Sequence, residues 1–165
     1  AFESAATNLV PGDTNGLSDI FVHDRATGTT TRVSVASGGA QGTGTTGMRS
    51  RRPSVSADGR FVAFDSDLAT LVAGDANGKA DVFVHDRVTG ATTRVSVATG
   101  GAEAVGDALG NIRPSISADG RLVAFVSDAA NLVSGDTNGF LDAFVHDRVT
   151  GETTRVSVRS GGAQA

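Results

Sequence analysis

One stretch of sequence occurs three times in this chain: GDTNGLSDIFVHDR from Gly12 to Arg25, GDANGKADVFVHDR from Gly74 to Arg87, and GDTNGFLDAFVHDR from Gly135 to Arg148. The first aspartates of the three copies are separated by 62 and then 61 residues, and the flanking segments keep the same offsets. A fixed period of this length is typical of repeat architectures, in which each unit packs on its neighbours. Fold and function must therefore be sought per repeat.

The composition indicates an all-β class. Glycine is abundant at 22 of 165 residues, the only aromatic residues are eight Phe, and Thr, Ser and Val are frequent, which favours short strands joined by turns. The formal net charge of -4 gives no general attraction for phosphate backbones, so we expect no nucleic-acid partner. No apolar run approaches the roughly 20 residues of a membrane-spanning helix, so we expect no membrane insertion.

One complete unit runs from Arg52 to Ile112, and its pattern predicts four strands near 53–56, 60–66, 80–87 and 92–97. A tight Asp-Gly turn joins the first two strands, because glycine adopts the positive φ that such a turn requires. The second and third strands have apolar residues on both faces, as strands covered on both sides do. Four antiparallel strands of this kind are typical of a propeller blade, and a solenoid of four-stranded units is the alternative.

Two segments carry a family resemblance: RPSVSADGRFVAF from Arg52 to Phe64 and RPSISADGRLVAF from Arg113 to Phe125, followed by VFVHD and AFVHD. They resemble the repeat of TolB-like propellers, also called PD40 or WD40-like β-propeller repeats, and the resemblance covers essentially the whole chain. It implies four-stranded blades. The repeat here is 61 to 62 residues long, against about 40 to 45 in propellers generally, through a longer loop before the third strand and a longer connector after the fourth.

The repeats divide the chain into a partial blade that lacks its first hairpin, with its connector (1–51), a complete blade (52–112), and a second complete blade with the start of a connector (113–165). The opening residues AFES match Ala63 to Ser66, so we expect a processed or trimmed polypeptide that begins within a repeat. Closed propellers usually have about four to eight blades. We therefore expect an open or partial propeller that continues in a longer chain or associates with itself.

The Asp-x-Asn-Gly-x-x-Asp loop of each repeat predicts a calcium site. Between its Asn-Gly and final Asp, the copies place three unrelated side chains, those of Leu17, Lys79 and Phe140, so only the backbone can have a fixed role there. Calcium takes about six to eight oxygen ligands and accepts backbone carbonyls beside carboxylates and amides. The loop also resembles the calcium loops of integrin-type propeller repeats, although it lacks one leading Asp of that pattern. The predicted ligands, one ion per repeat and with the carbonyl of the third residue in each set, are Asp13, Asn15, Leu17 and Asp19; Asp75, Asn77, Lys79 and Asp81; and Asp136, Asn138, Phe140 and Asp142.

Two structural interpretations stand beside the calcium hypothesis. The loop residues can form Asx-turns, in which Asp13 and Asn15 accept local backbone N–H groups. The His-Asp pairs at 23–24, 85–86 and 146–147 are interpreted as structural, because neighbouring residues of a strand point to opposite faces. One His per repeat and no Cys make zinc unpersuasive.

Arg49, Arg51 and Arg52 form a basic cluster. It is interpreted as a solvated loop, with an anion-binding patch as the alternative. No catalytic motif stands out.

The leading functional hypothesis is a calcium-stabilised, non-catalytic binding or scaffold module with an unknown protein or glycan ligand. We expect it outside the cytoplasm (extracellular, cell-surface or periplasmic), where millimolar calcium fills even weak sites. The alternative is the non-catalytic propeller part of a larger secreted hydrolase. A propeller that is itself catalytic is disfavoured, because an active site usually needs residues that break the repeat symmetry.

Overall fold

The structure is a computed structural model that describes residues 1–106 and 112–164. Residues 107–111, in the connector that ends the second unit, and Ala165 lie outside the described residues. All regular elements in the described ranges are β-strands, and none of those residues forms a helix that could cross a membrane. The strands are β1 (Phe2–Ser4), β2 (Asp19–Asp24), β3 (Thr29–Arg32), β4 (Ser50–Val55), β5 (Phe61–Ser66), β6 (Asp81–Asp86), β7 (Ala91–Arg94), β8 (Ile112–Ile116), β9 (Leu122–Ser127), β10 (Asp142–Asp147) and β11 (Glu152–Arg155).

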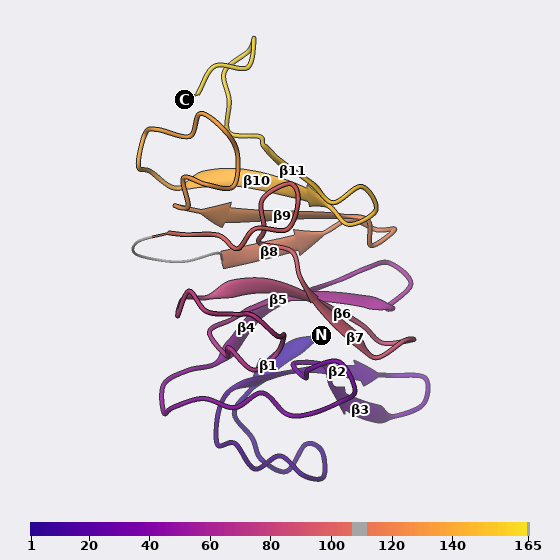
Figure 1. Ribbon diagram of the computed structural model, residues 1–165. Coiled ribbons are helices and arrows are strands. Elements are labelled where there is room, and N and C mark those ends of the chain that lie inside the picture. Colours follow the sequence, from indigo (N-terminus) through magenta and orange to yellow (C-terminus); the bar gives the residue numbers. More distant parts are fainter. Residues whose placement is uncertain (107–111, 165) are drawn as a thin grey trace.

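The strands form three antiparallel sheets that stack one on another along the chain (Figure 1). Blade 1 has the order β1-β2-β3, blade 2 has β4-β5-β6-β7, and blade 3 has β8-β9-β10-β11. The first and third blades lie at opposite ends of the stack, so the array is open (Figure 1). The predicted all-β class, four-stranded blades and open array are confirmed.

The observed strands differ from the predicted ranges at two places. β4 begins at Ser50 rather than near residue 53, and its pairing with β5 shifts register between Arg51 and Ser54, with Arg52 at a φ of 52°. The fourth strand of blade 2 ends at Arg94 rather than at Val97. Just past that end, the N–H of Val95 still donates to the Val82 carbonyl at 2.8 Å, but the N–H of Val82 donates to the hydroxyl of Ser96, so a side chain replaces half of the next rung of the backbone ladder.

The apolar core lies between the blades. Phe64 stacks on Phe83 with ring centroids 5.9 Å apart, and Phe125 stacks on Phe144 at 5.8 Å. All four rings are at most 2% exposed, which confirms the predicted central packing. One buried cluster joins blades 1 and 2 and includes Ile20 with the first ring pair, while the other joins blades 2 and 3. Each blade therefore buries one face on the next blade.

Candidate functional site

The Asp-x-Asn-Gly loop of each blade lies directly before the strand that carries the His-Asp pair, namely β2, β6 or β10. Gly16 adopts a φ of 66° and its counterparts Gly78 and Gly139 adopt 65° and 68°, a conformation that side chains with a Cβ resist. This sharp turn folds the start of each loop back toward its end. The two carboxylates of the loop consequently come together.

In the first loop the carboxylates converge on an arginine. The guanidinium Nη1 of Arg32 lies 3.1 Å from Asp13 Oδ1 and 3.6 Å from Asp19 Oδ2, and the side chain of Asp19 is fully buried. Asn15 donates its amide to Asp19 at 3.0 Å and accepts the N–H of Leu17 at 2.9 Å. The second contact is the Asx-turn that the sequence offered as an alternative.

The other two loops repeat this geometry. Arg94 Nη1 lies 3.5 Å from Asp75 and 3.6 Å from Asp81, and Arg155 Nη1 lies 3.2 Å from Asp136 and 3.6 Å from Asp142. The Asx-turns recur as well: Asn77 Oδ1 accepts the N–H of Lys79 at 2.8 Å, and Asn138 Oδ1 accepts that of Phe140 at 2.9 Å. All twelve predicted positions thus belong to three equivalent loops.

A serine, buried in blades 1 and 2 and half-buried in blade 3, fixes the last aspartate of each loop. Ser34 donates its hydroxyl to Asp19 Oδ1 and accepts the N–H of Ile20, so it ties the loop to the strand that follows. The same pair of bonds joins Ser96 to Asp81 and Ser157 to Asp142. These serines, like the arginines, were not among the sequence-predicted site residues.

A signal for the arginines is present in the sequence. Arg32, Arg94 and Arg155 each follow the first aspartate of their loop by 19 residues (13 to 32, 75 to 94 and 136 to 155). This constant offset matches that of the acidic residues within the loops. It becomes meaningful once strand pairing is known, because Arg32 lies opposite Phe21 in the register of β2 and β3.

The second loop differs from the other two in holding a third carboxylate. Glu103 lies where blade 1 has Gln41 and blade 3 has Gln164, and its carboxylate bonds to Arg94 and accepts the N–H of Ala76. Ligand oxygens of Asp75, Asp81 and Glu103 all lie within 4.8 Å of one another. Burial, and then the charge of Asp81, raises the pKa of Asp75 to about 6. Burial likewise raises the pKa of Asp81.

The loop geometry bears on calcium in two ways. It gathers the carboxylates that were predicted as ligands, but in each blade a guanidinium already bridges them. The Asn Oδ1 atoms are engaged by backbone N–H groups as well. A divalent cation would therefore bind only if the arginine withdrew, and calcium binding stays a prediction.

The histidines make structural contacts. His23 Nδ1 shares a hydrogen bond with Thr30 Oγ1 at 2.9 Å, and the same bond joins His85 to Thr92 and His146 to Thr153. Burial lowers the pKa of His85, so its neutral form is favoured. This agrees with the structural interpretation of the His-Asp pairs.

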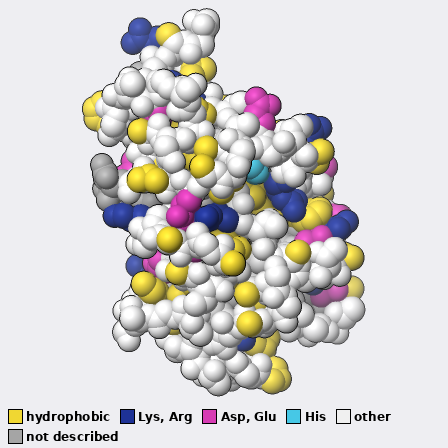
Figure 2. Space-filling view, in the orientation of Figure 1, with side chains coloured by type: hydrophobic (Ala, Val, Ile, Leu, Met, Phe, Trp, Pro, Cys, Tyr) yellow, Lys and Arg dark blue, Asp and Glu magenta, His cyan; other side chains and the backbone are white. Residues whose placement is uncertain are grey.

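Two residues of the arginine cluster, Arg51 and Arg52, lie in β4 and are ion-paired, which corrects the interpretation of a solvated loop. Arg51 and Arg52 both contact Asp65, at 3.0 and 3.3 Å, and Asp65 is fully buried. A buried carboxylate needs such partners, because desolvation otherwise disfavours its charge. Figure 2 shows basic and acidic side chains lying side by side on one face of the molecule.

No protein-family model matches this sequence, and no curated protein matches it. In structure it is similar to TolB from Acinetobacter baumannii, with 23% identity and a TM-score of 0.49, over 87% of this chain and 27% of that one. It is also similar to a protein from Agrobacterium tumefaciens assigned as TolB, with 19% identity and a TM-score of 0.51, over 86% of this chain and 42% of that one. The second likeness supports a TolB-like β-propeller fold. The chain spans less than half the length of either protein.

Proposed function

We propose that this chain is a non-catalytic binding or scaffold module, built of stacked propeller-type blades. The proposal rests on what the polar side chains of the three loops contact. The Asp and Asn residues of the three loops, and the Ser and Arg that reach them from the neighbouring strand, make the same set of bonds in every blade. Such residues hold loops in place, whereas catalysis generally needs a constellation that differs from repeat to repeat. Blades held in this way present a rigid surface to a partner.

Calcium stabilisation is part of the proposal, and the second blade supports it best. Three carboxylates there face one arginine, whereas the first and third blades have glutamine in place of Glu103. Two oxygens that share a calcium ion lie at most about 5 Å apart, because each is about 2.3 to 2.6 Å from the ion. The spacing within 4.8 Å in the second loop fits that limit. The ion would be held by Asp75, Asp81 and Glu103, with Asn77 and the Lys79 carbonyl as further oxygen donors.

A location outside the cytoplasm belongs to the same proposal. A site that must displace an arginine binds weakly, and calcium is abundant enough to fill weak sites only outside cells, where modules with dissociation constants of about 0.1 to 1 mM are common. The chain also contains no cysteine, which is compatible with an oxidising compartment.

The equivalent residues Glu103 and Gln41 provide a matched test of calcium binding. Calcium is titrated by calorimetry into the chelator-treated wild type and into Glu103→Gln, which gives the second loop the composition of its siblings. We expect one calcium per chain for the wild type and at least a tenfold loss of affinity for the variant. The converse change, Gln41→Glu, should add a second site. Absence of heat in the wild type at millimolar calcium, or equal binding by the wild type and Glu103→Gln, would remove calcium from the proposal.

A further inference from the structure

The first strands of blades 2 and 3 each contain an arginine in a backbone conformation that few side chains tolerate. Arg52 has a φ of 52° and Arg113 a φ of 59°, and within the described ranges they are the only residues other than glycine with a positive φ. Both lie where the register of the sheet shifts, and both directly precede a proline, which favours extended backbone instead. Glycine would take this conformation without strain, so an arginine costs stability at both positions.

The backbone of Arg113 has a structural role that its side chain does not share. Asp65 of blade 2 is fully buried, and burial raises its pKa, whereas the backbone N–H of Arg113 is one of the groups that lower this pKa again. The irregular backbone therefore places an N–H beside a buried carboxylate of the preceding blade. A glycine at position 113 would provide the same N–H, so this contact does not explain why the residue is an arginine.

The guanidinium of Arg113 lacks the acidic partner that its counterpart in blade 2 has. Arg52 Nη1 lies 3.3 Å from Asp65, on the adjacent strand β5. The position equivalent to Asp65 in blade 3 is Val126 of β9, so that blade offers no carboxylate there. No acidic side chain of the described residues lies within salt-bridge distance of Arg113.

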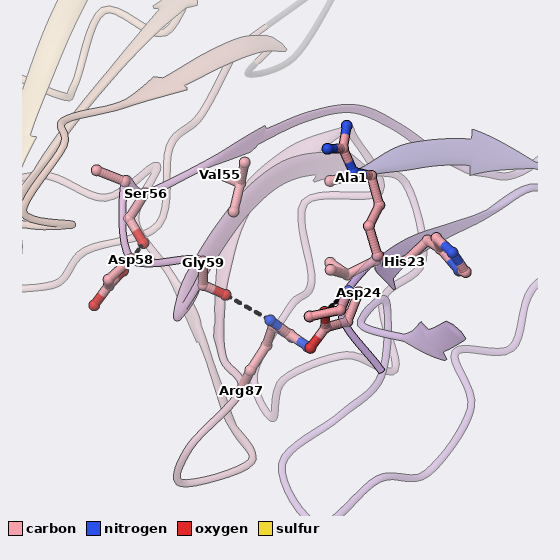
Figure 3. Close-up of a pocket in the computed structure, with 12 residues that line it drawn as sticks. Ala1, His23, Asp24, Val55, Ser56, Asp58, Gly59 and Arg87 are labelled. Carbon is pink, nitrogen blue, oxygen red and sulfur yellow. Dashed lines mark hydrogen bonds between the residues drawn. The ribbon is translucent and has the colours of Figure 1, made fainter. Parts of the chain in front are cut away.

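Most arginines of blades 2 and 3 do have partners within the chain. Arg60 pairs with Asp86 at 2.7 Å, for example, and Figure 3 shows Arg87 donating to the carbonyl of Gly59, also at 2.7 Å. Arg113 is exposed and makes no such side-chain contact with the described residues. Its guanidinium can therefore meet a group from outside the chain.

The two strained arginines lie on neighbouring strands, and both reach solvent. β4 and β8 are the first strands of their sheets and contact each other, with the N–H of Ile116 donating to Ser54 Oγ at 3.1 Å. The side chain of Arg52 is 41% exposed although blade 2 has a blade on each side (Figure 1). Exposure is therefore a property of this position in the blade, and Arg113 shares it.

The local balance of charge favours an acidic partner. Arg51 lies 3.0 Å from Asp65 and 3.6 Å from Asp67. Arg52 shares Asp65, which leaves Arg113 as the cation without a carboxylate among the described residues. The chain as a whole has a net charge of -4, which repels a dense polyanion but not a short acidic segment that meets only this spot. The planar guanidinium group also matches the geometry of a carboxylate.

We propose that Arg113, with Arg52 on the neighbouring strand, binds a carboxylate of an acidic peptide segment in a partner protein. Arg113 supplies the guanidinium that pairs with the ligand. Arg52 adds a second positive charge, since its side chain and the backbone of Arg113 both face Asp65. Backbone strain of this kind is kept where a side chain is needed for a function other than folding.

The probe is fluorescently labelled hexaglutamate, added to the full chain at low ionic strength and followed by anisotropy. The wild type should bind it saturably and should not bind hexaglutamine. Arg113→Gly should lose affinity at least tenfold, the factor expected on losing a charge-assisted hydrogen bond. Its melting temperature should be no lower than that of the wild type, because glycine relieves the strain. Arg113→Ala should lose as much affinity but melt below Arg113→Gly, because alanine keeps the strain.

A further variant keeps Arg113 and gives it an internal partner. Val126→Asp supplies blade 3 with the carboxylate that blade 2 has in Asp65, so it should also weaken hexaglutamate binding. The matched control is Arg159→Gln, which changes the net charge by the same amount at an exposed position outside the strands and should leave binding unchanged. Circular dichroism checks that every variant is folded.

The proposal fails if the wild type shows no saturable binding, or if Arg159→Gln weakens binding as much as Arg113→Gly. It fails as well if Arg113→Gly melts clearly below the wild type, because the side chain would then serve folding. Tighter binding of trigalacturonate or of inorganic phosphate than of hexaglutamate would overturn the assignment to an acidic peptide. The inference rests on the proposed binding role, but its residues are not those of the calcium loops, so either experiment can fail without the other.

Discussion

Replacing Arg94 by glutamine tests the central electrostatic argument. Arg94 is the cation shared by Asp75, Asp81 and Glu103, with oxygens at 3.5, 3.6 and 2.5 Å. The side chains of the two aspartates are 2% and 0% exposed, so water cannot replace the lost partner. The variant Arg94→Gln therefore leaves three carboxylates close together with no guanidinium between them.

The size of the expected stability loss follows from the burial of the two aspartates. Removing one partner of a buried ion pair costs about 3 to 5 kcal/mol, whereas an exposed pair contributes at most about 1 kcal/mol. Glu103, 22% exposed, adds a third carboxylate and therefore a further, smaller repulsion in the variant. We expect Arg94→Gln to lower the free energy of unfolding by about 3 to 5 kcal/mol at pH 7, a large part of the roughly 5 to 15 kcal/mol of a typical domain.

The loss should depend on pH. The pKa of Asp75 is raised to about 6 in the folded chain from an ordinary 3.8, so the folded state takes up a proton between these values. Stability from this group is therefore highest in acid and falls as the pH rises through about 6. At pH 5 a protonated Asp75 relieves part of the repulsion, and the variant should lose less than at pH 7.

The assay is urea unfolding at pH 7 and pH 5, followed by far-ultraviolet circular dichroism because the chain has no Trp or Tyr. Arg32→Gln is the matched control, since the first loop has two carboxylates and Gln41, and it should lose less stability. Millimolar calcium should restore part of the loss in Arg94→Gln, because an ion that binds only the folded state stabilises it. A loss below about 1 kcal/mol at pH 7, or the same loss at both pH values, would refute the reasoning.

Two further predictions concern the blades themselves. Phe64→Ala should lower the free energy of unfolding in urea by about 3 to 5 kcal/mol, because the ring is 0% exposed. Phe2 occupies the equivalent position in blade 1 and is 37% exposed, so Phe2→Ala should lower it clearly less. Equal losses would contradict an inter-blade core. The hydrogen bond from Arg60 holds the pKa of Asp86 far below its ordinary value, so its stabilisation is present above about pH 4 and lost as the pH falls. The melting temperature of Asp86→Asn should therefore lie below that of the wild type at pH 7 and approach it near pH 2, and a gap that persists in acid would count against the ion pair.

The sequence alone determines the architecture of this protein, because each local turn and strand pattern recurs from one repeat to the next. The Asp-Gly turn at residues 58–59, the apolar run that contains Phe64 and the 61- to 62-residue period together predict stacked four-stranded blades. The convergence of Asp13, Asn15 and Asp19 was also predictable, since residues two and six positions apart in one glycine turn have few other places to lie. These are short-range effects of backbone conformation and hydrophobic patterning.

The tertiary structure decides which partner each polar group finds. Arg32 reaches Asp13 and Asp19 because the register of β2 and β3 brings it there, and that register depends on the geometry of the turn that joins the two strands. Contacts between blades are likewise set by packing, as where the N–H of Ile116 meets Ser54 Oγ across 62 residues. The loop carboxylates are neutralised by arginines from other segments of the chain, and packing brings those segments together.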